Sequence, residues 1–90
     1  MENMCGCFSN FREIAEEERK LFEETLRGFV GVGRTPLAVA TQVVNGTNYA
    51  FLCDSQVVIP DAVHYNDLVI IYKPLNGEPI LKEVKEVKIL

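Results

Sequence analysis

Residues 41–49 of the chain read Thr-Gln-Val-Val-Asn-Gly-Thr-Asn-Tyr, and this segment carries the clearest structural signal in the sequence. Its Asn45-Gly46 pair stands between β-branched and aromatic residues, which is the strongest short-range sequence signal for a β-hairpin. The pattern predicts two antiparallel strands that are joined at Asn45-Gly46 by a turn of type I′.

Further turn signals divide the rest of the chain into strands: Asp54-Ser55, Pro60-Asp61 and Asn76-Gly77. We expect strands near residues 36–44, 47–53 with a possible extension to 58, 67–73 and 79–89. The last is the least regular, because its apolar residues fit a helical spacing as well as a strand interrupted by a bulge. Its content of Val and Ile favours the strand.

A helix precedes the strands. Asn10 and Glu13 have the spacing of a capping box, and apolar residues recur from there at helical intervals, at Phe11, Ile14, Ala15, Leu21, Phe22, Leu26 and Phe29. The pattern predicts one amphipathic helix over residues 11–27, which the glycines at 28, 31 and 33 end. The sequence therefore predicts an α+β fold, with one helix packed across a four-stranded, or alternatively five-stranded, antiparallel sheet.

Length and composition bound the class of protein. A chain of 90 residues forms a single domain, residues 1–90. Its net charge is -4, and the 9 Lys and Arg are spread among 13 Asp and Glu, which argues against a nucleic-acid partner. The longest aliphatic run, residues 68–72, is too short to cross a membrane, and the first residues lack a leader pattern, so we expect a cytoplasmic protein with no membrane partner.

Residues that could carry chemistry are few. Cys5, Cys7 and Cys53 are odd in number, and the spacing of the first two suits neither a disulfide nor a zinc site. His64 is the only histidine, so a metal site lacks ligands and a Cys/His nucleophilic pair would need chance proximity. We therefore expect no cofactor, no metal and no enzymatic activity.

The predicted topology brings separate segments to one edge of the sheet. Successive turns of a meander alternate between the two ends, so the turns at 45–46 and 74–77 share one end. A helix antiparallel to the strand that follows it sends residues 1–8 to the same end. Both turns carry apolar residues where turns are usually polar, at Val43, Val44, Pro74 and Leu75. An interaction edge and an ordinary hairpin both fit these residues.

Residues 42–46, Gln-Val-Val-Asn-Gly, resemble the Gln-x-Val-x-Gly hairpin of the cystatins, in the form found in stefins. Asn45 stands where those relatives generally carry Ala or Ser. Residues 73–77, Lys-Pro-Leu-Asn-Gly, are similar to the second hairpin of the family, although the chain has no Trp to form the Pro-Trp pair of secreted members. The resemblance covers the topology of residues 11–90.

The resemblance implies a reversible, tight-binding inhibitor of papain-like cysteine proteases. In that family an N-terminal segment around a glycine and two hairpins form a wedge that fills the substrate cleft. By position it assigns protease-binding roles to Gly6, Gln42, Val43, Val44, Asn45, Gly46, Pro74, Leu75, Asn76 and Gly77. The alternative function is a non-inhibitory protein-binding module of cystatin-like fold. We expect a monomer; a domain-swapped homodimer, formed by opening of the first hairpin as in stefins, is the alternative state.

Overall fold

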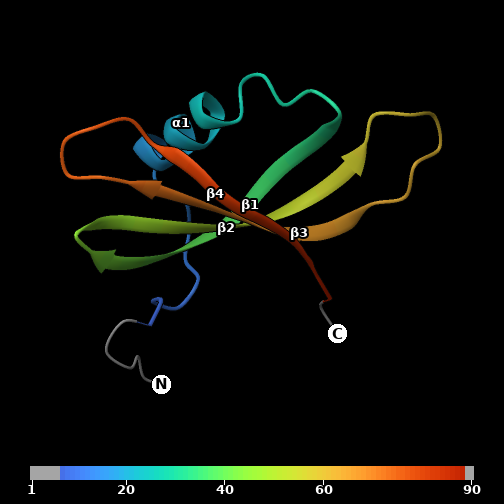
Figure 1. The fold of residues 1–90 in the computed structure, drawn as a ribbon. Helices are drawn as coiled ribbons and strands as arrows, with labels where there is room; N and C mark the ends of the chain where they lie inside the picture. The colour runs from blue at the N-terminus through green and yellow to red at the C-terminus, as the bar shows by residue number, and fades with distance from the viewer. Residues whose placement is uncertain (1–6, 89–90) are drawn as a thin grey trace.

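Four antiparallel strands and one helix make up the structure, a computed structural model that describes residues 7–88. The strands are β1 (Val32–Val44), β2 (Gly46–Val57), β3 (Tyr65–Lys73) and β4 (Ile80–Val87). They lie in the order β1-β2-β3-β4, so each strand pairs with its neighbours along the chain. Helix α1 (Glu16–Thr25) lies across one face of the sheet (Figure 1). The predicted α+β class and the four-stranded meander are confirmed.

The first hairpin is longer than predicted at its open end. β1 begins at Val32 and not at residue 36, and β2 reaches Val57, which the longer predicted extent allowed. The pairing continues as far as Val32 opposite Val57, with one bulge just after Pro36. Pro36 is tolerated because β1 is an edge strand. The glycines at 31 and 33 had made this part of the chain resemble a helix end, which is why the sequence pattern missed it.

The second hairpin also has the predicted elements with shifted ends. β3 begins at Tyr65 and not at residue 67, and β4 is a strand, as its Val and Ile content favoured. The predicted bulge in β4 is confirmed, because Ile70 pairs with Glu83 while the next residue, Ile71, pairs with Leu81. Lys82 is the extra residue, and it explains why the apolar positions of β4 do not alternate.

The helix is shorter than predicted, since α1 has 10 residues and does not span 11–27. The residues before it are extended because Arg12 and Val39 exchange two backbone hydrogen bonds, of 2.9 and 3.0 Å. The predicted Asn10–Glu13 capping box is therefore wrong, and the helix begins where the Ala15 N–H donates to Glu18 Oε1 at 2.9 Å. The Arg12–Val39 pairing is an isolated bridge and not a fifth strand. No helix in the described part of the chain is long and apolar enough to span a bilayer.

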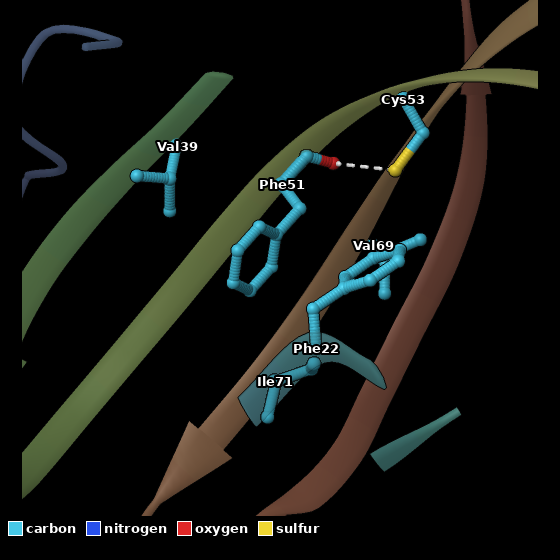
Figure 2. Close-up of a cluster of buried hydrophobic side chains, with 6 residues drawn as sticks. All are labelled: Phe22, Val39, Phe51, Cys53, Val69 and Ile71. Atoms are coloured by element: carbon cyan, nitrogen blue, oxygen red, sulfur yellow. Dashed lines mark hydrogen bonds between the residues drawn. The ribbon is translucent and has the colours of Figure 1, made fainter. Parts of the chain in front are cut away.

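The hydrophobic core lies between α1 and the sheet (Figure 2). Its buried side chains come from the helix and three strands: Phe22, Val39, Phe51, Cys53, Val69 and Ile71. The rings of Phe22 and Phe51 meet with centroids 4.9 Å apart and hold the helix on the sheet. Each large buried side chain contributes about 1.5–3 kcal/mol to stability. Phe11 and Phe29, predicted for the same helical face, lie outside the helix and are exposed.

A buried carboxylate joins three strands toward the end of the sheet away from the first hairpin. Asp67 on β3 accepts hydrogen bonds from Ser55 Oγ on β2 at 2.7 Å and from Arg34 Nε on β1 at 2.9 Å. Because a buried charge is costly unless it is paired, these two partners are what make Asp67 compatible with the interior. Burial raises the pKa of the nearby Cys53 thiol to about 12, with the Asp67 carboxylate acting in the same direction, so this thiol stays neutral.

Candidate functional site

The two hairpin tips predicted to share one end of the sheet do lie side by side (Figure 1). Thr47, just after the first tip, pairs with Val43 on β1 and with Lys73 on β3. Lys73 is the last residue before the second tip, so both tips project from the same end of the sheet. We call residues 43–46 and 74–77 together the hairpin edge.

The first tip turns more tightly than the sequence pattern predicted. Val44 pairs with Gly46, which leaves Asn45 alone at the apex. Gly46 has a φ of 110°, whereas Asn45 does not have a positive φ. A type I′ turn needs positive φ at both central residues, so that prediction is wrong. The one positive φ of this turn is at Gly46, which has no Cβ and therefore adopts this conformation without a steric clash.

Gly46 packs closely against the end of β3. Its backbone is buried, and a Cβ placed on it would lie 2.5 Å from the Lys73 carbonyl oxygen and 3.0 Å from both Pro74 Cα and Tyr72 Cε1. The glycine therefore lets the first tip pack directly against the strand that leads to the second. The close backbone approach expected of this residue is made within the chain itself.

Tyr72 provides a second link between the tips that the sequence pattern did not reveal. Its hydroxyl, carried on β3, donates a hydrogen bond to the carbonyl oxygen of Asn45 at the apex of the first tip. The contact joins residues 27 positions apart, so no local pattern could indicate it. It holds the apex against β3 and limits the freedom of the first tip.

Apolar side chains project from both tips into solvent. Val43 is 80% exposed, Leu75 is 72% exposed and Val44 is 46% exposed. Asn45, Asn76 and Gly77 are exposed between them, and Pro74 is half-buried. Exposed apolar side chains on a rigid support gain free energy when a partner removes them from water, at about 25 cal/mol per Å². The hairpin edge is therefore narrow, projecting and partly apolar.

Gln42 lies behind the tip and not on it. It pairs with Asn48 across the hairpin, and its Oε1 accepts a hydrogen bond from Asn48 Nδ2 at 2.8 Å. The side chain is half-buried. Its contact braces the base of the first tip, so the predicted set of site residues divides into those that project and those, Gln42 and Gly46, that support them.

The N-terminal segment approaches the same edge alongside β1. Ser9 and Thr41 are joined twice, through Ser9 N–H to the Thr41 oxygen at 2.8 Å and through Thr41 N–H to Ser9 Oγ at 3.0 Å. Because the segment runs antiparallel to β1, the chain before Ser9 heads toward the first tip, where Cys7 is exposed. Gly6, the predicted N-terminal contact glycine, lies outside the described residues.

An ion pair fixes the direction of that segment. Both guanidinium nitrogens Nη1 and Nη2 of Arg12 donate to the carboxylate of Glu18 in the first turn of α1, at 2.9 and 2.6 Å. The same carboxylate accepts the Ala15 N–H. The hydrogen bond from Arg12 lowers the pKa of Glu18, and the pKa of Arg12 is raised in return. Glu18 thus connects the start of the helix to the segment that pairs with β1.

The cysteines and the histidine do not form a nucleophilic pair in the described residues. Cys53 is fully buried, and Cys7 is exposed in the N-terminal segment. His64 belongs to the connection at the opposite end of the sheet, where its Nδ1 lies 3.0 Å from Asp54 Oδ1. Within residues 7–88 no group of His, Cys, Asp and Glu side chains is placed to hold a metal ion. The candidate site is therefore the hairpin edge, a binding surface and not a catalytic pair.

A helix laid across a four-stranded antiparallel meander, with the N-terminal segment and two hairpin tips at one edge, is the cystatin fold. The structure is similar to that of a secreted type 1 cystatin from Fasciola hepatica, with a TM-score of 0.68 and 24% sequence identity. The match covers 91% of this chain and 96% of that one. The sequence matches no protein-family model and no curated protein.

Proposed function

We propose that this chain is a reversible inhibitor of papain-like cysteine proteases and not an enzyme. The observation that supports the proposal most directly is that two exposed apolar tips and the N-terminal segment meet at one narrow edge of a cystatin fold. A projecting edge of this shape is suited to enter a cleft, whereas an active site would need to be one.

The proposed mechanism is occlusion of the substrate cleft. Val43 and Leu75, the most exposed apolar residues of the edge, would lose water on entering the cleft, and Val44, Asn45, Pro74 and Asn76 would line the contact around them. Gln42 and Gly46 would hold the first tip in shape, Gly77 would lie at the contact on the second tip, and Gly6 would bring the N-terminal segment into contact. Because the tips are tied to the sheet before binding, little conformational entropy remains to be lost.

The second tip is the smaller anchor of the two. Leu75 is its only exposed large apolar side chain, and the chain has no Trp. Since aromatic anchors dominate many protein interfaces, we expect the first tip and the N-terminal segment to carry most of the affinity. Localisation in the cytoplasm and a monomeric state at low protein concentration remain predictions.

Titration of papain with the protein tests the proposal. We expect stoichiometric, reversible loss of peptidase activity, and absence of inhibition at micromolar protein would reject the proposal. Val43→Glu should raise the inhibition constant at least about 30-fold, because it places a charge where the cleft is dry. Val30→Glu is a matched control, since Val30 is 82% exposed against 80% for Val43 and lies at the opposite end of the sheet.

A non-inhibitory binding module is the second candidate, favoured by the missing aromatic anchor at Leu75. A binding measurement with papain whose catalytic thiol has been carboxymethylated distinguishes the inhibitor from the non-inhibitory module. An inhibitor should still bind it with Val43 and Leu75 at the contact, whereas a module with another target should ignore both forms of the enzyme.

A further inference from the structure

A second exposed apolar surface lies at the end of the sheet away from the hairpin edge. It is formed where the connection from α1 to β1, residues 26–31, meets the connection from β2 to β3, residues 58–64 (Figure 1). The two connections are joined by the Val58 N–H, which donates to the Gly31 oxygen at 3.1 Å. We define the distal patch by five exposed large apolar residues near this link: Phe29, Val30, Val57, Val58 and Ile59.

The distal patch has the shape of a contact surface and not of a projecting edge. Next to the apolar side chains is a shallow hollow of about 390 Å³, lined by Gly33, Gln56, Val57, Val58, Ile59 and Pro60. Val57, Val58 and Ile59 line the hollow and are also exposed, so a depression and exposed apolar residues lie on the same part of the surface. Two-fold interfaces need this property, because each copy presents the same surface to the other.

Charge favours a second copy of the chain as the occupant. Residues 28–33 and 57–60 contain no Asp, Glu, Lys or Arg, although the chain as a whole carries a net charge of -4. An uncharged surface can meet itself without like-charge repulsion, which the acidic outer face of α1 could not do. The patch is also bordered by one charge of each sign, Arg27 on one connection and Asp61 on the other. A two-fold arrangement can therefore pair opposite charges at its rim.

The exposed area is suited to a modest dimer. The residues of the distal patch leave on the order of 500 Å² in water, within the range of about 300–600 Å² for the largest apolar patch of a monomer, and such patches are often functional. A standard interface buries about 800 Å² on each partner, so the patch with its hollow and polar rim supplies an area of that order. The nearby free edge of β1 is blunted by Pro36 and a bulge, which disfavours strand addition and leaves side-chain packing as the mode of contact.

We propose that the distal patch is a two-fold interface between two copies of this chain. The contact is made by side chains of the two connections, with no exchange of segments between the copies. It leaves both hairpin edges free at the far ends of the dimer. The proposal does not rest on protease inhibition, and it differs from a swapped dimer, in which the first hairpin would open.

Sedimentation velocity of the full chain, from low to high micromolar concentration in reducing buffer, tests the interface. The reductant removes dimers linked through Cys5 or Cys7. We expect a concentration-dependent dimer that returns to monomer rapidly on dilution. Val30→Glu and Val58→Glu should each weaken dimerisation at least about tenfold, since every substitution enters a two-fold interface twice. Val43→Glu adds the same charge at a valine of matched exposure on the hairpin edge and should leave dimerisation unchanged.

Several results would overturn the proposal. A chain that is monomeric over the whole range has no such interface. A dimer that persists on dilution until the protein is unfolded is a swapped dimer, and one that Val43→Glu weakens as much as Val30→Glu is not formed at the distal patch. Binding of phosphatidylcholine vesicles that Val30→Glu abolishes, with no dimer in solution, would assign the patch to lipid. Circular dichroism checks the fold of each variant. Val30 is 82% exposed, so Val30→Glu should stay folded and keep the test intact even if Val58→Glu fails to fold.

Discussion

The hairpin edge and the distal patch are both exposed and apolar, yet they are built in different ways. At the hairpin edge the tips continue paired strands, Gly46 packs on the backbone of Lys73, and Tyr72 holds the apex at Asn45. At the distal patch every residue except Val57 lies outside the strands, and one backbone hydrogen bond, Val58 to Gly31, joins the two connections. The first surface projects and is braced, whereas the second is broad and shallow.

This difference shows how one small sheet supports two kinds of contact. A narrow apolar edge buries the most surface when a cleft surrounds it, so its partner must be concave. The edge itself binds most tightly when its shape is fixed before binding. A shallow surface buries the most area against another shallow surface. Its backbone needs fewer supporting contacts, because both partners can adjust side-chain rotamers. We therefore expect substitutions at one end of the sheet to leave binding at the other end unchanged.

The largest difference should come from the same substitution made at the two ends. Gly46→Ala places a methyl group 2.5 Å from the Lys73 oxygen at a φ of 110°, and we expect it to destabilise the fold by about 2–4 kcal/mol and to weaken papain inhibition. Gly31→Ala meets no atom within 4 Å, so it should change stability by less than about 1 kcal/mol. Urea denaturation of both variants measures the difference.

Equal costs for the two alanine variants would mean that the hairpin edge is no better braced than the distal connections. The close packing around Gly46 also means that a bulky residue at this position cannot test binding separately from folding. Such a side chain would displace Lys73 and Pro74 before any protease met it. Substitution of Val43, which projects freely, separates binding from folding more cleanly.

The elements that local residues decide were predictable. The Asn45-Gly46 signal located the first hairpin, and the Val and Ile content of β4 identified a strand with a bulge. The helix start was not predictable, because Asn10 and Glu13 have the same spacing as a genuine cap. What decides between them is the pairing of Arg12 with Val39, a contact between residues far apart in the chain.

The candidate site was predictable in outline and incomplete in detail. Alternation of turns in a meander is enough to bring the tips at Val43 and Leu75 to one end. The hydroxyl of Tyr72 bonds a residue 27 positions away, so no spacing revealed it. The local contact of Glu18 with Arg12 was missed because residues 11–15 were predicted to be helical. The distal patch was hidden for another reason, since Phe29 fitted the helical repeat and only the early end of the helix at Thr25 leaves it exposed.

A smaller effect is expected from the link between the two tips. Tyr72→Phe removes the hydroxyl that donates to the Asn45 oxygen and keeps the ring that packs near Gly46. We expect a loss of about 1 kcal/mol in stability and an inhibition constant raised by no more than about fivefold. Tyr65→Phe, the same change near the other end of β3, is the control and should leave inhibition unchanged. Full potency in Tyr72→Phe would show that the apex is rigid without this contact.

The smallest effect concerns the N-terminal segment and depends on pH. The hydrogen bond from Arg12 lowers the pKa of Glu18 below its ordinary value of 4.5, so the ionised carboxylate stabilises the folded state. That contribution is present above the ordinary pKa and is lost as the pH falls through the folded one. Because the Arg12 side chain is 46% exposed, we expect Glu18→Gln to cost less than about 1 kcal/mol at neutral pH.

Urea denaturation of the wild type and Glu18→Gln at pH 7 and pH 3 measures this contribution directly. The gap between the two proteins should narrow on acidification, because the wild-type carboxylate then loses its charge while the amide does not titrate. Glu17→Gln removes the same charge from the neighbouring exposed position without the contact to Arg12, so its gap should be smaller at pH 7. A gap for Glu18→Gln that is equal at both pH values would mean that the ion pair does not hold the segment beside β1.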